Sequence, residues 1–129
     1  MRVRGFVGDV HAEIGRAAVY VVPLHVGGGI RIKILEAMAM GMPIVTTSVG
    51  CEGIKATAGT HFCVADSAEE FAAAVILLLR RPELARAIGS AARECVAREY
   101  NWHTTAEIIE REFLRLAART PRTTVENNV

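Results

Sequence analysis

The sequence predicts an α/β domain built on a doubly wound, Rossmann-like parallel sheet of about four strands, flanked by helices. Short β-branched segments alternate along the chain with segments of helical periodicity, which is typical of parallel sheets crossed by helices. A glycine triplet also joins a predicted strand to a predicted helix, and ligands of such domains bind at the carboxyl ends of the strands. The chain has 129 residues, 51% of them hydrophobic, which is enough for one small packed domain.

Apolar periodicity gives the order of the elements. Four β-branched runs are predicted as strands, at residues 3–7, 19–23, 43–48 and 60–66. Five segments are predicted as helices, at residues 8–17, 30–40, 68–80, 82–100 and 101–118. Asp9 is expected to cap the first helix, Ser67 and Glu70 form a capping box, and Gly41 with Pro43 ends the second helix. Residues 1–118 therefore form the domain, and 119–129 are a polar tail expected to be disordered.

Composition excludes several classes of partner. Fifteen basic and fourteen acidic residues give a net charge of +1 without a basic stripe, so no nucleic-acid partner is predicted. The longest apolar run, Phe71–Leu79, is too short to be transmembrane. The three cysteines form no C-x-x-C pair, which suits reduced thiols in a cytoplasmic protein. No metal site and no cofactor are predicted.

One carboxylate, Glu36, lies in the predicted helix 30–40, whose other positions are apolar nearly all round. A helix of this kind is normally packed inside a domain, so Glu36 is expected to be buried. An unpartnered buried carboxylate costs several kcal/mol. Two partners are open: Lys33, three residues earlier on the same face, and a ligand that carries hydroxyl groups.

Three glycines, Gly27, Gly28 and Gly29, lie between a predicted strand and the start of the Glu36 helix. Bare backbone at such a point can approach a phosphate, and the first helical N–H groups point toward it. Arg31 and Lys33 add positive charge to the same end. The alternative is a flexible turn that binds nothing.

Seven segments then resemble a known family when taken in order: GFVGDV, VYVVPL, GGGIRIKILEAMAMGMPIVTT, GCEGI, FCVAD, EEFAAAVILLL and REYNW. They are similar to the C-terminal, donor-binding part of GT-B-type retaining glycosyltransferases, the large "glycosyl transferases group 1" family. The likeness runs from Val3 to Leu116. Because the chain begins almost directly in a strand-like run, it is expected to be an N-terminally truncated fragment without the acceptor-binding domain.

The resemblance implies a transferase that moves a sugar from a UDP- or GDP-type nucleotide sugar to an acceptor, with retention. In the family a glutamate matching Glu36 accepts hydrogen bonds from the ribose hydroxyls. By the same likeness the diphosphate is bound by Gly27, Gly28, Gly29, Ile30, Arg31 and Lys33. The family usually has a second glutamate eight positions before Glu36, and this chain has Gly28 there, so no catalytic residue is assigned. The fragment alone is expected to be inactive.

Three further residues are candidates for contacts to the nucleotide or the donor sugar. His25 precedes the glycines at a strand end and faces either a donor sugar or only its local surroundings. Glu52 and Gly53 belong to the loop after the third predicted strand, which either wraps the ligand or is a plain turn.

Two other functions stay open. A non-catalytic remnant or assembly module would self-associate as a homodimer through an exposed sheet edge, and a GT-B-type sugar-nucleotide epimerase is the third hypothesis. The edge arises because strands one and two of a doubly wound domain have no counterpart in this chain. Either Val3–Val7 pairs directly with Val19–Leu24, or the strands of two chains pair there.

Overall fold

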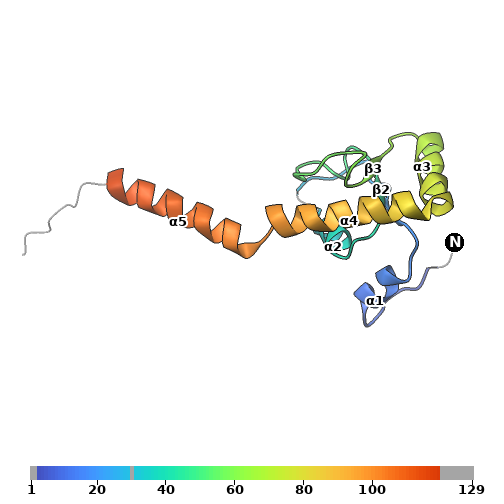
Figure 1. The fold of residues 1–129 in the computed structure, drawn as a ribbon, viewed down its shortest axis with the longest axis horizontal. Helices are drawn as coiled ribbons and strands as arrows, with labels where there is room; N and C mark the ends of the chain where they lie inside the picture. The colour runs from blue at the N-terminus through green and yellow to red at the C-terminus, as the bar shows by residue number, and fades with distance from the viewer. Residues whose placement is uncertain (1–2, 30, 120–129) are drawn as a thin grey trace, which may run out of the picture. The chain divides into compact units, whose positions relative to one another are not determined.

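The computed structural model describes residues 3–29 and 31–119. The chain separates into two compact units, Met1–Glu99 and Tyr100–Val129. The first unit contains the sheet and four helices among its described residues (Figure 1). The second contains one helix.

The first unit is built on a parallel sheet of three strands in the order β1-β2-β3. Its strands are β1 (Tyr20–Val22), β2 (Ile44–Thr46) and β3 (Cys63–Val64). Tyr20 lies opposite Ile44, and Val45 lies opposite Cys63. The helix α2 (Ile32–Ala39) connects β1 to β2, as parallel neighbours require. The predicted α/β class with a parallel sheet is confirmed, with strands shorter than the sequence runs suggested.

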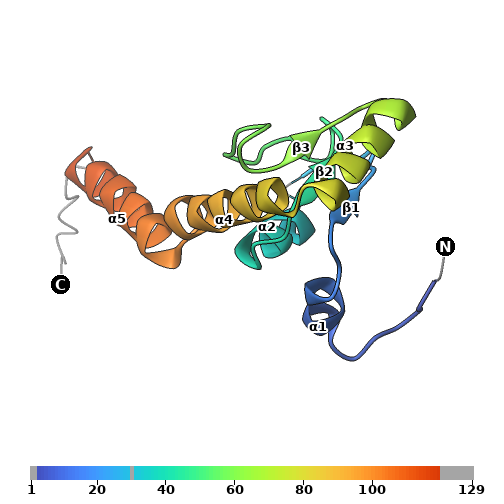
Figure 2. The ribbon, with the colours of Figure 1, turned by 45° about the vertical axis from the view of Figure 1, so that its right-hand side comes forward.

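Helices cover both faces of the sheet, because consecutive strand side chains point to opposite sides. Ile44 packs in a core under α2, and Val45 packs in a second core under α3 (Ala68–Arg80). The helix α4 (Pro82–Glu99) contributes Ala85 and Ile88 to the second core and Ala92 and Cys95 to the first. Figure 2 shows α4, in yellow to orange, running beside α2.

The predicted helix ends agree with the structure. The Asp9 carboxylate accepts a hydrogen bond from the Ala12 N–H at 3.0 Å and caps α1 (Val10–Gly15). The Ser67 hydroxyl accepts from the Glu70 N–H at 3.2 Å and caps α3. Gly41 follows α2 with φ at +71°, the left-handed conformation that a glycine cap provides.

The predicted first strand is absent. Residues 3–7 form no strand, and the side chains of Val3 and Phe6 are 81% and 98% exposed. A β-branched run becomes a strand only if a neighbour accepts its backbone hydrogen bonds, and in the described residues no strand lies beside it. Gly5, with φ at +64°, also interrupts the extended backbone.

Direct closure of Val3–Val7 onto Val19–Leu24 was therefore a wrong prediction. Among the described residues β1 pairs with β2 alone, and its other edge carries no partner strand. Val21 on this edge strand is 46% exposed. The other alternative, pairing between two chains, is not tested by the structure of a single chain.

Two glycines allow α2 and α4 to approach closely. A Cβ atom built on Gly89 of α4 would lie 2.1 Å from the carbonyl oxygen of Gly41. No side chain fits there, so the glycine permits the contact between the C-terminal end of α2 and the middle of α4. This contact helps to hold α2 against the sheet.

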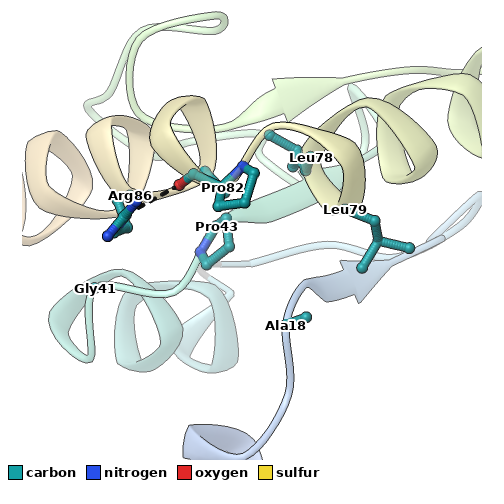
Figure 3. A pocket seen from close by; sticks show the side chains of 8 residues that line it. Ala18, Gly41, Pro43, Leu78, Leu79, Pro82 and Arg86 are labelled. Carbon is teal, nitrogen blue, oxygen red and sulfur yellow. Dashed lines mark hydrogen bonds between the residues drawn. The ribbon is translucent and has the colours of Figure 1, made fainter.

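A cavity of about 430 Å³ lies at the amino end of the sheet, near Ala18 and Pro43, which precede β1 and β2 (Figure 3). Leu78 and Leu79 of α3 form an apolar part of the cavity wall. Arg86 donates from Nε to the carbonyl oxygen of Pro82 at 3.3 Å. This edge is opposite to the one where parallel α/β domains bind their ligands.

The second unit contains α5 (Trp102–Arg119). Four large apolar side chains expected on one side of this helix, Ile108, Ile109, Phe113 and Leu116, are all at least half exposed. The predicted polar tail lies beyond the described residues from position 120 onward, and its disorder stays a prediction.

Candidate functional site

Three loops meet at the carboxyl edge of the sheet and are joined by hydrogen bonds. They follow β1, β2 and β3 at residues 23–29, 47–54 and 65–67. The hydroxyl of Thr47 donates to the carbonyl oxygen of Leu24 and accepts from the Gly50 N–H at 3.1 Å. Thr47 is 2% exposed, so this buried hydroxyl fixes the first two loops relative to each other.

The glycine loop between β1 and α2 is folded around an arginine of its own. Arg31 donates from Nη1 to the carbonyl oxygen of Gly28 at 2.7 Å. Its guanidinium also lies against Gly27, where a Cβ atom would be 2.6 Å from Nη2. Gly27 and Gly29 have φ values of +148° and +81°, which other residues rarely adopt. The glycines are thus needed both for the backbone path and for the packing of Arg31.

Two donors of Arg31 lack acceptors. Its Nε and Nη2 atoms are buried, and no hydrogen-bond partner for them occurs among the described residues. A buried unpaired donor costs about 1–3 kcal/mol, so this arrangement would gain from an oxygen acceptor. Of the predicted diphosphate contacts, Gly27 to Gly29 and Arg31 do lie together, whereas Ile30 is outside the described residues.

The amino end of α2 is electropositive. The helix has no acidic residue in its first turn, and Arg31 at the N-cap position makes no side-chain cap. Lys33 is exposed in the first turn. The first N–H groups of a helix have no intrahelical acceptor and carry partial positive charge, so cations there repel it. An anion would relieve this repulsion.

The expected burial of Glu36 was wrong. Its side chain is exposed, and α2 buries only Ile34, Ala37 and Met38. Only one side of α2 packs on the sheet and on α4, so apolar composition alone did not predict the packing. No ion pair between Glu36 and Lys33 occurs in the described chain, so the alternative that Lys33 is the partner of Glu36 is also wrong.

Glu36 nevertheless lies within electrostatic range of Tyr20 in β1. Burial raises the pKa of Tyr20 in β1, and the nearby carboxylate of Glu36 raises it further. The carboxylate therefore lies near enough to the Tyr20 hydroxyl to act on it electrostatically. An exposed carboxylate in this place is free to accept hydrogen bonds from a ligand.

A further carboxylate at this edge, Asp66, follows β3 and was not predicted from the sequence. Its Oδ1 atom accepts from the backbone N–H and the hydroxyl of Ser48, at 2.8 and 2.9 Å. These two bonds lower the pKa of Asp66, and His25 lowers it further. His25 and Asp66 both line a cavity of about 300 Å³. The signal available in the sequence was the position of Asp66 just beyond a predicted strand.

The predicted contacts Glu52 and Gly53 are both exposed in the loop that follows β2. Gly53 has φ at +78°, and Ile54 after it is buried and bonds back to the carbonyl oxygen of Cys51 at 3.1 Å. The loop is thus anchored at its base with Glu52 directed to solvent. The role of Glu52 in binding stays a prediction.

The fold and these loops define a class: a Rossmann-like α/β domain with a glycine-rich loop and an electropositive helix start at its carboxyl edge, suited to anionic ligands. The described residues contain no cluster of three side chains that could hold a metal ion. None of the helices they form has both the length and the apolar character of a membrane span.

Comparison with known proteins makes the assignment specific. The profile of the family "Glycosyl transferases group 1" matches residues 1–81, and the chain belongs to this family. The structure is similar to that of a sucrose-phosphate synthase from Thermosynechococcus elongatus, with a TM-score of 0.68 and 27% identity over 81% of this chain. The match covers 26% of the synthase, so this chain spans about a quarter of its length. A search of curated proteins finds no match. The family expected from the sequence is confirmed.

Proposed function

We propose that this chain is the donor-binding part of a retaining glycosyltransferase that takes a UDP- or GDP-type nucleotide sugar. The observation that carries the proposal is the glycine loop at the start of α2, where Arg31 and Lys33 are the charged residues and no acidic residue occupies the first turn. A diphosphate supplies the anion that this end of the helix favours. The acceptor would bind to another domain, so the chain alone would bind donor and transfer little or nothing.

In this proposal each polar group at the edge has one task. The backbone N–H groups of Gly28, Gly29 and Ile30 donate to the phosphate oxygens, and Lys33 adds charge. Arg31 turns from the Gly28 carbonyl to the diphosphate, which would give acceptors to its two unpaired donors. As the sugar leaves, these groups stabilise the negative charge that develops on the diphosphate, and the step requires no metal.

Glu36 would bind the ribose. An exposed carboxylate can accept hydrogen bonds from two neighbouring hydroxyl groups. The free thiols of Cys51, Cys63 and Cys95 suit a cytoplasmic protein, where nucleotide sugars would be met as substrates.

Calorimetric titration with UDP and with GDP tests this function. One of the two nucleotides is expected to bind saturably, and Glu36→Ala to weaken its binding roughly tenfold or more. The reason is that a hydrogen bond to a charged group contributes about 1.5–3 kcal/mol. Glu94→Ala, which removes an exposed carboxylate from α4, is the matched control and should change the affinity less than twofold. Equal affinities of the two variants would refute the ribose role, and absence of binding by both nucleotides would refute the function.

A second candidate is an assembly module that forms a homodimer through β1. It is favoured by the outer edge of this strand, which pairs with no strand among residues 3–29 and 31–119, and by the exposure of Val21. Such an edge offers backbone donors and acceptors to a strand of another copy.

Sedimentation velocity over a range of micromolar concentrations tests the assembly. If β1 pairs between copies, the chain sediments as a dimer and Val21→Lys sediments as a monomer, since a charge at the new interface is disfavoured. Val26→Lys is the control, because Val26 is 88% exposed and lies outside the strand. A monomeric wild-type chain, or equal dimerisation of both lysine variants, would eliminate this candidate.

A further inference from the structure

The cavity at the amino end of the sheet, called the amino-edge cavity below, has the make-up of a ligand site although it lies opposite the glycine loop. Its volume of about 430 Å³ is within the range of sites for small organic ligands. It is lined by Ala18, Gly41, Pro43, Leu78, Leu79, Pro82, Ala85 and Arg86 (Figure 3). All of these residues belong to the first compact unit, so a ligand here would be held by one unit alone.

The wall of the amino-edge cavity is largely apolar. Leu79 is 53% exposed, whereas Leu78 before it is 1% exposed and packs in the second core. Figure 3 shows two prolines, Pro43 and Pro82, in the wall beside Leu79. Arg86 lies on the other side of these prolines (Figure 3). The wall is therefore an apolar path that ends at one charged group, and a hydrocarbon body laid along it would remove the path from water.

Arg86 is the charged residue in the described lining of the amino-edge cavity. Its Nε atom donates to the carbonyl oxygen of Pro82, and its Nη2 atom donates to the carboxylate of Glu83, both at 3.3 Å. These two bonds keep the guanidinium beside the turn between α3 and α4. Nη1 donates to no described residue, so it is a charged donor that a ligand can use.

The surrounding charges favour an anion. Residues 78–86 contain three arginines, Arg80, Arg81 and Arg86, and one acidic residue, Glu83. All four side chains are exposed, and Glu83 is already paired with Arg86. A ligand with a positive charge would be repelled from this turn, whereas a negative charge would be attracted. The planar donors of a guanidinium match the two oxygens of a carboxylate in particular.

We propose that the amino-edge cavity binds a small organic carboxylate, whose hydrocarbon body lies against Leu79 and the two prolines and whose carboxylate accepts from Nη1 of Arg86. This inference goes beyond the proposed function and does not rest on it, because no residue of the cavity belongs to the glycine loop. The chain would then have a second ligand site at the edge of the sheet opposite to the nucleotide.

Amide NMR of the ¹⁵N-labelled chain with octanoate, octan-1-ol and octylammonium tests the proposal, because the three compounds share one hydrocarbon body and differ in the charge of the head group. Octanoate, at concentrations where it forms no micelles, is expected to shift the amides of Leu79, Ala85 and Arg86 saturably. Octan-1-ol should bind roughly threefold more weakly or worse, and octylammonium should bind more weakly still. Equal affinities of the three compounds would overturn the role of the carboxylate. Octanoate shifts confined to the exposed apolar residues of α5, or no shifts at all, would overturn the site.

Two matched variants test the contact with Arg86. Arg86→Gln removes the charge of an exposed side chain, so the affinity for octanoate should fall roughly threefold or more while that for octan-1-ol is unchanged. Arg115→Gln is the control: Arg115 pairs with Glu112 at 3.3 Å, as Arg86 pairs with Glu83, but does not line the cavity. Equal octanoate affinities of the two variants would overturn the contact.

Leu79→Ala tests the apolar wall separately. Because about half of this side chain is exposed, the variant is expected to fold, which an otherwise unchanged amide spectrum would verify. It should weaken octanoate and octan-1-ol by the same factor, since both lose the same apolar contact. Unchanged binding of both compounds would place the hydrocarbon body elsewhere and overturn the proposed site.

Discussion

Gly89→Ala is expected to lower the free energy of unfolding by about 2–3 kcal/mol, although alanine is the better helix former. The new Cβ atom would lie 2.1 Å from the carbonyl oxygen and 2.9 Å from the carbonyl carbon of Gly41. These are backbone atoms, so they cannot rotate away as the end of a long side chain would. Helices α2 and α4 must therefore separate, and the clash outweighs the gain in helix propensity of about 1 kcal/mol.

Urea denaturation checks this expectation, with the midpoint falling and the m value unchanged. Ser90→Ala is the matched control: the same residue is introduced at the next, exposed position of α4, where stability should rise by a few tenths of a kcal/mol. A Gly89→Ala protein as stable as the Ser90→Ala protein would show that α2 and α4 are not held at this contact. The site depends on the contact, because α2 presents both the glycine loop and Glu36.

The regular elements could be predicted because their signals are local. Asp9, Gly41 and Ser67 end or begin helices through bonds and conformations that involve their immediate neighbours. Helix α3 begins at Ala68 and ends at Arg80, as periodicity predicted. The parallel sheet followed from the alternation of such elements. The helix caps needed only a window of a few residues, whereas the sheet needed the order of the elements along the chain.

The predictions that the structure contradicts concern contacts between a segment and other parts of the fold. Val3–Val7 has strand composition, yet a strand exists only beside another strand, and no strand among the described residues lies beside this segment. Glu36 lies in an apolar helix, yet burial depends on how many sides of the helix find neighbours, and the packing of α2 leaves this carboxylate exposed. The periodicity of a segment describes its own faces and not what lies against them.

The candidate site was predicted only in part, because some of its contacts are local in the sequence and others are not. Gly27, Gly28 and Gly29 could be located because a glycine triplet between a strand and a helix is a local pattern. Arg31 and Gly28, which are joined by a hydrogen bond, are also close in the sequence, but their bond depends on the path of the loop backbone. Asp66 was missed because its partner Ser48 is eighteen residues away, and only the parallel pairing of β2 with β3 brings the two together.

Gly50→Ala is expected to lower the free energy of unfolding by about 2 kcal/mol, because it would disturb the loop that follows β2. The backbone at Gly50 does not need glycine, but a Cβ atom there would lie 2.1 Å from the hydroxyl oxygen of Thr46. Thr46 is fully buried in the sheet, and its hydroxyl donates to the carbonyl oxygen of Val22 at 3.3 Å. A β-branched side chain in a strand has few alternative rotamers, so the loop must move instead.

A double-mutant cycle with Thr46→Ala isolates this contact. Thr46→Ala alone should lower the free energy of unfolding by about 1 kcal/mol or more, because a hydrogen bond and a buried methyl group are lost. In that background Gly50→Ala should lower the free energy of unfolding much less, because the 2.1 Å contact is gone and only two atoms of Thr47 at 3.3 Å remain near the new Cβ atom. The expected coupling energy is at least about 1 kcal/mol. Gly28→Ala is the control for a glycine substitution in open space and should be close to neutral. If the two costs simply add, the loop at the carboxyl edge is positioned by the Thr47 bonds alone and Gly50 is needed for another reason.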